Sequence, residues 1–228
     1  MTTKPVSPQP DTAEVVQFPD PPPEEMTAFY DVNLPAYPAS LVLHFGNPET
    51  TIIVSELATG VRPTQSYRGI LFPDLLVAFG VDPAAHRTRN GYLIPEQGKP
   101  PDFVMEVASK TTARRDETVK RDAYAAMGIP EYWRFDATGG QQYRTHLAGD
   151  RLVEGTYVPI PIHQTGEGHH WGHSQALGLD LCWEDGNLRF WDPASRIYLT
   201  TFADERAART AAEARVRELE EQLRRLTP

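Results

Sequence analysis

Two nearly continuous apolar runs in the middle of the chain predict strands that are buried on both faces. They are residues 70–82 (ILFPDLLVAFGVD) and residues 101–109 (PDFVMEVAS), and each contains a Pro-Asp pair where its strand begins. Proline is tolerated at that first position. Residues 50–58 are rich in β-branched side chains and predict another strand, as do residues 131–136 (EYWRFD), whereas residues 41–45 form a short apolar segment.

A helix is predicted between the second buried strand and the strand at 131–136. Val119, Ala123 and Met127 repeat at four-residue spacing, which indicates one apolar face. Gly128 then stands where a helix commonly ends, and Pro130 prevents its continuation. The order strand, strand, helix, strand predicts an α/β core in which helices flank a mixed β-sheet.

Glycine, proline and charged residues interrupt the remaining segments. Residues 83–100 predict a loop or loose hairpin, residues 141–160 a hairpin that turns at 148–150, and residues 163–173 an exposed glycine-rich loop. The last segment carries His163, His169, His170 and His173, which invites a zinc interpretation. Because no second ligand cluster with fixed spacing accompanies them, zinc is a secondary alternative.

The two ends of the chain differ from this core. Residues 1–25 are rich in proline and acid and predict a disordered leader. Near the other end, apolar residues recur at gaps of four, three, four and three, and they are Ala212, Val216, Leu219, Leu223 and Leu226. This amphipathic pattern predicts a short coiled coil, or a single helix packed on its own domain. We therefore expect a leader (1–25), a core domain (26–200) and a C-terminal heptad helix (201–228).

Composition and charge narrow the setting more than the function. No run of about 18 apolar residues exists, so no transmembrane helix is expected, and the single cysteine, Cys182, fits a reducing cytoplasmic interior. The net charge of −9 argues mildly against tight nonspecific DNA binding. Basic residues nevertheless crowd the predicted helix, which permits a local phosphate contact.

Acidic residues inside the apolar strands carry the candidate chemistry. Glu106 lies within FVMEVA and Asp74 precedes five apolar residues, and a buried carboxylate is costly unless it is paired or bound to metal. Two such carboxylates on successive strands fit Mg²⁺, which takes one or two protein carboxylates. Asp102 shares a strand face with Glu106, although a turn-capping role would equally explain each Pro-Asp pair. Lys120 on the following helix is the best candidate for a catalytic lysine, and Lys110 is the alternative.

The stretches FPDLLVAF, PPDFVMEVASKTT and RRDETVKRDAYAAMGIPEYWRFD resemble the Uma-type family of putative restriction endonucleases, within the PD-(D/E)XK nuclease superfamily. That family combines a Pro-Asp strand, a PDxxxEVxS strand, a helix with Lys and Tyr, and a turn like GIPEYW. The resemblance runs from about Met26 to the C-terminus. It implies a restriction-endonuclease-like fold in which Asp74 and Glu106 bind the metal.

The resemblance also implies where the remaining site residues lie. In the wider superfamily a lysine stands two residues after the glutamate, where this chain has Ala108. In Uma-type proteins the lysine lies on the following helix, which corresponds to Lys120. Ser109 and Tyr124 match the family's serine and tyrosine, and we expect them to support the site together with Asp102.

Two functions remain open from the sequence. The first is a metal-dependent DNA endonuclease that uses Mg²⁺, or Mn²⁺ as a substitute, to activate water against a phosphodiester. The second is a catalytically inactive nuclease-fold module that binds nucleic acid or a protein partner. A homodimer formed through the C-terminal helix would bring two active sites together, as cleavage of both strands commonly requires.

Overall fold

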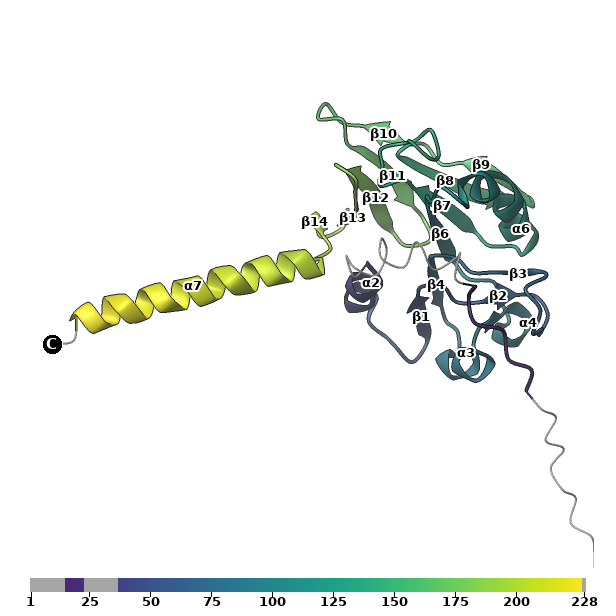
Figure 1. Cartoon of the computed structure of the whole chain (residues 1–228), viewed down its shortest axis with the longest axis horizontal. Coiled ribbons are helices and arrows are strands. Elements are labelled where there is room, and N and C mark those ends of the chain that lie inside the picture. The colour runs from purple at the N-terminus through teal and green to yellow at the C-terminus, as the bar shows by residue number, and fades with distance from the viewer. Residues whose placement is uncertain (1–14, 23–36, 227–228) are drawn as a thin grey trace, which may run out of the picture.

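The computed structural model describes residues 15–22 and 37–226 (Figure 1). Along the chain its elements are α2 (Tyr37–Phe45), β1 (Thr51–Val54), β2 (Thr59–Gly60), β3 (Ile70–Leu71), β4 (Leu75–Phe79), α3 (Pro83–Arg89), β5 (Tyr92–Leu93), α4 (Ile94–Gln97), β6 (Phe103–Val107), α5 (Ala113–Arg115), the π-helical turn η2 (Asp116–Lys120), α6 (Arg121–Ala126), β7 (Glu131–Phe135), β8 (Leu147–Val153), β9 (Thr156–Pro159), β10 (His163–Gln164), β11 (His170–Ser174), β12 (Leu179–Glu184), β13 (Asn187–Asp192), β14 (Ile197–Tyr198) and α7 (Phe202–Leu226).

A six-stranded mixed sheet forms the centre of the domain. Its strand order is β1-β4-β6-β7-β8-β9. Strands β6 and β7 are parallel, and every other neighbouring pair is antiparallel. The parallel connection passes through α5, η2 and α6, as a crossover between parallel strands requires. The α/β class and the mixed sheet flanked by helices are therefore confirmed.

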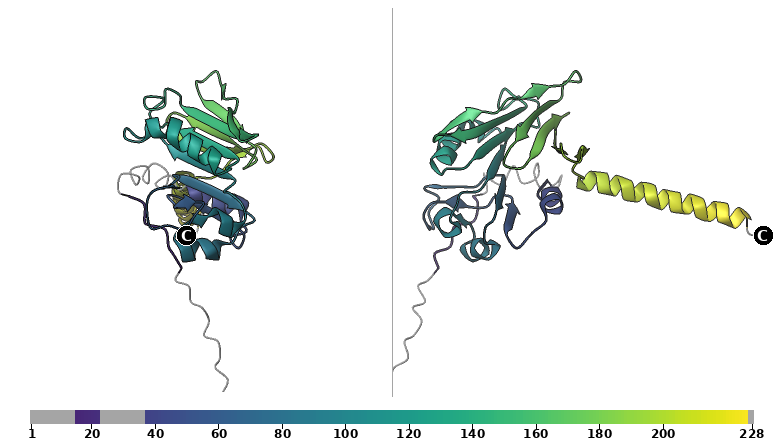
Figure 2. Two further views of the ribbon diagram at one scale, coloured as in Figure 1. Left: turned by 90° about the vertical axis from the view of Figure 1, so that its right-hand side faces the viewer. Right: turned by 180° about the vertical axis from the view of Figure 1, so that it is seen from behind.

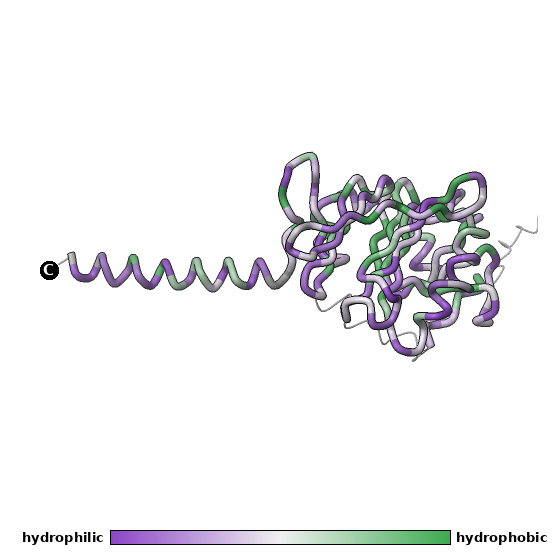
Figure 3. Tube along the Cα trace, turned by 90° about the horizontal axis from the view of Figure 1, so that it is seen from above, coloured by the Kyte–Doolittle hydropathy of each residue, from purple (hydrophilic) through white to green (hydrophobic). Residues whose placement is uncertain are grey.

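The two faces of this sheet are covered differently. Alternate strand residues such as Leu75, Met105 and Trp133 face a second sheet, which has the order β10-β11-β12-β13-β14, and share one apolar core with it. The intervening residues, such as Leu76 and Val104, face the helix that ends in α6. Figure 2 shows the layers from two sides, and Figure 3 shows hydrophobic segments concentrated within the domain. Burial on both faces explains the uninterrupted apolar runs of β4 and β6.

Three segments that were predicted as loops or turns contain helices or strands, so those predictions were wrong. Residues 83–100 contain α3 and α4, with the Asp82 carboxylate accepting a hydrogen bond from the Ala84 amide at the start of α3. Residues 148–150 lie inside β8, and the hairpin turns instead at Glu154 and Gly155, whose φ angles are 49° and 80°. The residues 163–173 include β10 and most of β11 of the second sheet rather than an exposed loop.

The end of the predicted leader packs on the domain. Phe18 is only 3% exposed and joins Ala58, Ile70, Phe72 and Leu93 in a small apolar cluster beside the three-stranded sheet β3-β2-β5. Residues 15–22 are therefore not part of a disordered leader, because they contribute an aromatic anchor. Residues 1–14 and 23–25 of that predicted segment lie outside the described residues.

The C-terminal helix α7 is present as predicted, with 25 residues. It leaves the domain and extends away from it (Figures 1 and 2). At its first turn Asp204 pairs with Arg189 of the domain at 3.3 Å, whereas the side chains from residue 205 to 222 are exposed, so this stretch of the helix does not pack on its own domain, the alternative left open by the sequence. Among the described helices, none combines the length and apolarity that crossing a bilayer demands.

Candidate active site

The register of β4 and β6 places the two predicted metal ligands opposite each other. Leu75 pairs with Met105 and Leu76 with Val104, so continuing the antiparallel ladder by one step brings Asp74 across from Glu106. The amide of Val107 donates a 2.6 Å hydrogen bond to Oδ2 of Asp74, which fixes that carboxylate against the neighbouring strand. Directly opposed residues of antiparallel strands point to the same face. Both carboxylates therefore face the helix layer.

The helix that covers this face presents a polar stripe. Asp116, Lys120 and Tyr124 recur every four residues, and each is at most 1% exposed. Val119, which the sequence placed on the buried face, is 60% exposed. That prediction was wrong because apolar periodicity identifies the buried face of a helix only when the buried face is apolar. The π-helical turn between Asp116 and Lys120 lies at this point, and such turns are frequent at functional sites.

Lys120 reaches Glu106 as the sequence anticipated. Its Nζ lies 2.9 Å from Oε2 of Glu106 and 3.2 Å from Oδ1 of Asp116. Oε1 of Glu106 accepts a 2.6 Å hydrogen bond from the Tyr124 hydroxyl. Glu106 is thus held by two side chains that come from consecutive turns of one helix. Lys120 and Tyr124, which the sequence selected, are brought directly onto the strand carboxylate.

Asp116 is the member of the site that sequence reasoning missed. Its Oδ2 accepts hydrogen bonds from Tyr143 at 2.7 Å and from Thr112 at 3.0 Å, and its backbone oxygen accepts one from Tyr132 at 2.8 Å. Asp116 belongs to the predicted helix, but no role in the site was predicted for it. The available signal was its spacing, because it stands four residues before Lys120 and therefore on the same helix face.

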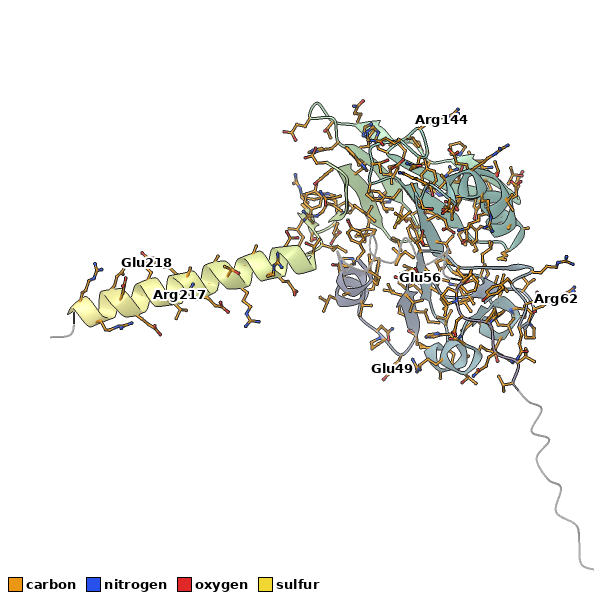
Figure 4. The ribbon with its side chains drawn as sticks, viewed as in Figure 1. Glu49, Glu56, Arg62, Arg144, Arg217 and Glu218 are labelled. Carbon is orange, nitrogen blue, oxygen red and sulfur yellow. The ribbon has the colours of Figure 1, made fainter. Side chains whose placement is uncertain are left out.

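Glu56 flanks the pair on the opposite side. Extending the ladder of β1 and β4 by two residues beyond Val54 and Leu76 brings Glu56 beside Asp74. Its amide donates a 2.9 Å hydrogen bond to the Pro73 carbonyl, and its φ of 53° ends the strand there. Figure 4 shows Glu56 near the middle of the domain. The sequence analysis included this residue in a strand without assigning it a role.

The site holds more negative than positive charge in a buried setting. Asp74, Glu106 and Asp116 are 6%, 1% and 0% exposed, and Lys120 is the cation that contacts two of them. Burial raises the pKa of Asp74 well above its usual range, and the nearby Glu106 carboxylate raises it further. Burial also raises the pKa of Glu106 to about 7, while the Lys120 ammonium opposes that shift. Each ionised carboxylate here favours an added proton or cation.

The other predicted residues occupy supporting or separate positions. Asp102 caps the start of β6, because its oxygens accept hydrogen bonds from Lys99 at 2.7 and 2.8 Å and from the Phe79 amide at 2.8 Å. Ser109 bonds to the hydroxyl of Thr112, the residue that donates to Asp116. Lys110 is exposed, and Lys120 is the lysine that reaches the carboxylates.

The donor chemistry of the site fits a hard divalent cation. Carboxylate oxygens are the ligands Mg²⁺ takes, and one or two of them suffice. Each oxygen of Glu106 accepts one hydrogen bond and has capacity for a second interaction. Oδ1 of Asp116 is buried and accepts no hydrogen bond from the described residues, and its contact there is the ion pair with Lys120 at 3.2 Å. Within residues 15–22 and 37–226, no three acidic, His or Cys side chains already converge on one metal position.

Comparison with known proteins identifies the family of this chain. A solved structure of a putative nuclease of DUF820 from Anabaena variabilis is similar at 13% identity with a TM-score of 0.37; the match covers 56% of this chain and 66% of that one. The chain thus spans slightly less than two thirds of that protein. No curated protein matches the chain. The Uma2 family, described as putative restriction endonuclease, matches residues 40–181, which include all of Asp74, Glu106, Asp116 and Lys120. This chain belongs to the Uma2 family.

Proposed function

We propose that this chain is a metal-dependent endonuclease that hydrolyses phosphodiester bonds of DNA, with Asp74 and Glu106 holding Mg²⁺. The single observation that carries the proposal is the gathering of three buried carboxyl groups around one buried lysine where β4, β6 and the helix meet. A buried charge that lacks an opposite charge lowers the free energy of unfolding by several kcal/mol. Well-packed apolar residues in the same space would give a more stable fold. A set of carboxylates opposed by one lysine is therefore better explained by a bound cation than by stability.

The chain's own groups then have separable roles. When bound, Mg²⁺ lowers the pKa of a coordinated water and offsets charge on the scissile phosphate. Lys120 brings an ammonium group to the same point, where it can stabilise negative charge that develops on the phosphate oxygens. Tyr124 and Asp116 position Glu106 and Lys120 through the contacts at 2.6 and 3.2 Å. Because Glu106 and Lys120 are each 1% exposed, a substrate reaches them only after a local displacement.

Cleavage assays with matched variants test this proposal. Purified protein is incubated with supercoiled plasmid, single-stranded DNA and RNA, with Mg²⁺, with Mn²⁺ and with EDTA. We expect plasmid cleavage that needs the metal and is abolished by Asp74→Asn and Glu106→Gln. Lys120→Met should reduce the rate by about 10²–10³-fold, the usual effect of removing one charge-stabilising group. Glu117→Gln, on the same helix but outside the buried stripe, is the control and should cut normally.

The alternative, a nuclease fold without catalysis, is favoured by one observation. Lys120 already pairs with both Glu106 and Asp116, so two of the three carboxyl groups have a cation without any metal. Titration calorimetry with Mg²⁺ and Mn²⁺ separates the two functions. Metal binding that disappears in Asp74→Asn supports the nuclease. If neither ion binds and no substrate is cut, the chain is an interaction module.

A further inference from the structure

Helix α7 carries an apolar seam whose described side chains, those of Ala212, Val216 and Leu219, are exposed. The helix is 25 residues long, which corresponds to roughly 37 Å at 1.5 Å per residue. Val216 is 53% exposed and Leu219 is 47% exposed, although both are large and apolar. Figure 3 shows pale-green turns along the otherwise hydrophilic helix. In proteins most of the stability of a helix comes from packing of its amphipathic face, so a partner surface that covers this seam would stabilise α7.

The spacing of the seam fits a coiled coil with a second helix of the same kind. Counting the heptad from the sequence, Val216 and Leu223 occupy a positions, and Ala212, Leu219 and Leu226 occupy d positions. Arg209 stands at the preceding a position, so the apolar part of the seam begins at Ala212. Among parallel coiled coils, a β-branched residue at a with leucine at d favours a dimer of two helices. The pair Val216 and Leu219 provides this combination.

The flanking charges select the orientation. Arg215 occupies a g position and Glu220 the e position of the following heptad. In a parallel pair, g of one chain faces this e position of the other, so two opposite-charge contacts form across the interface. In an antiparallel pair e faces e, which brings glutamates at 213 and 220 together. Charge complementarity therefore favours the parallel arrangement.

The ion pairs within the helix leave this interface accessible. Arg215 Nη1 lies 2.6 Å from Oε2 of Glu218 on the exposed surface, and such surface pairs contribute little energy. Arg215 can thus exchange this contact for one to a partner chain at low cost. Figure 4 shows Arg217 and Glu218, which occupy the outer b and c positions, on the part of α7 far from the domain. Substitutions at Arg217 therefore provide a control outside the seam.

We propose that α7 pairs with α7 of a second copy of this chain in a parallel two-stranded coiled coil. Each helix is attached to its domain at the Phe202 end. A parallel pair consequently holds both domains at the same end of the coiled coil, whereas an antiparallel pair would separate them along its length. This assembly does not depend on the proposed cleavage activity, and its test needs no substrate.

Oligomeric state provides the first test. Sedimentation velocity and light scattering across micromolar to millimolar concentrations should give a species of twice the 25.5 kDa monomer mass. Leu219→Glu should leave only monomer, and Arg217→Glu, which adds negative charge outside the seam, should still dimerise. Arg215→Glu should weaken association by about tenfold, as expected for replacing two attractive contacts with repulsion. Adding Glu220→Arg to that variant should restore it.

Disulfide crosslinking provides the test of orientation. Identical d residues, and identical a residues, face each other in a parallel pair, so Ala212→Cys and Leu223→Cys should each form crosslinked dimers under mild oxidation. In an antiparallel seam a residues face d residues, so residue 212 would face residue 223 and the two copies of residue 212 would lie about 16 Å apart, too far for a disulfide. The wild type is the control for the native thiol Cys182, which is buried.

Each outcome decides the proposal. A monomer at every concentration overturns it, and so does a dimer that survives Leu219→Glu, because the interface would then lie elsewhere. If the protein dimerises but neither Ala212→Cys nor Leu223→Cys forms a crosslinked dimer, the parallel arrangement is overturned. If the wild-type protein dimerises through α7 but cuts no substrate, the endonuclease proposal fails and the coiled-coil proposal is unaffected.

Discussion

The stability of the metal-free protein should fall as pH rises from 4.5 to about 7, and Glu106 should account for much of the loss. Burial raises the pKa of this carboxyl from 4.5 to about 7. Below pH 4.5 both the folded and the unfolded chain hold the proton. Between 4.5 and 7 only the folded chain holds it, so the free energy of unfolding decreases with rising pH, by about 3 kcal/mol in total at 1.4 kcal/mol per unit.

Urea unfolding at pH 5 and pH 7.5 in the presence of EDTA measures this loss. Glu106→Gln should flatten the pH dependence, because the amide does not titrate and because its removal also relieves Asp74, whose pKa Glu106 helps to raise. Glu117→Gln should keep the wild-type dependence. Equal slopes for wild type and Glu106→Gln would refute the assignment of a buried proton to this site. Saturating Mg²⁺ should recover stability at pH 7.5, since a ligand that binds only the folded state stabilises it.

Three further predictions concern packing and hydrogen bonds. Gly149→Ala should destabilise by about 1–3 kcal/mol, because the added methyl group would lie 3.0 Å from the buried ring of Trp133, as thermal unfolding can measure. Tyr143→Phe should cost about 2 kcal/mol in urea unfolding and lower cleavage, since it removes the 2.7 Å hydrogen bond to Asp116. Glu131→Gln should lower the free energy of unfolding by about 3 kcal/mol, because that carboxylate accepts hydrogen bonds from both sheets. An unchanged urea unfolding curve would contradict this.

The strands of the central sheet could be predicted because strands buried on both faces consist almost entirely of apolar residues. Apolar runs covered on both faces need no knowledge of partners, and β4 and β6 lie where those runs indicated. The element at 148–150 could not be predicted in the same way. Gly149 sits in a strand because the Trp133 ring occupies the space of a side chain, and a contact between residues 16 positions apart leaves no local signal. Gly149 beside Ala148 and Asp150 resembles a turn unless that ring is known.

The site was partly predictable for a different reason. Glu106 stood out because a carboxylate in an apolar strand lacks a turn-capping explanation, and Lys120 followed from the helix after it. Asp116 did not stand out because acids are common in the first turns of helices. Its burial depends on Tyr143, which donates from a segment 27 residues away. Hydrophobic periodicity identifies the buried face of a helix from its apolar residues. It therefore cannot identify a polar face that is buried against other polar groups.

The two faces of β6 impose opposite requirements on one strand. Met105 and Val107 anchor the sheet in the apolar core, where close packing gives the strand little freedom to move. Glu106 between them points to the charged side, where burial disfavours its ionised form even beside Lys120. The rigid face therefore holds the carboxylate in place at a cost that the apolar core offsets. Lys120 and Tyr124, by contrast, come from a helix interrupted by a π-helical turn, and under the proposed function we expect a substrate to displace this layer. Ligands fixed on the sheet and a cation carried on the helix would let the site open without losing its metal-binding geometry.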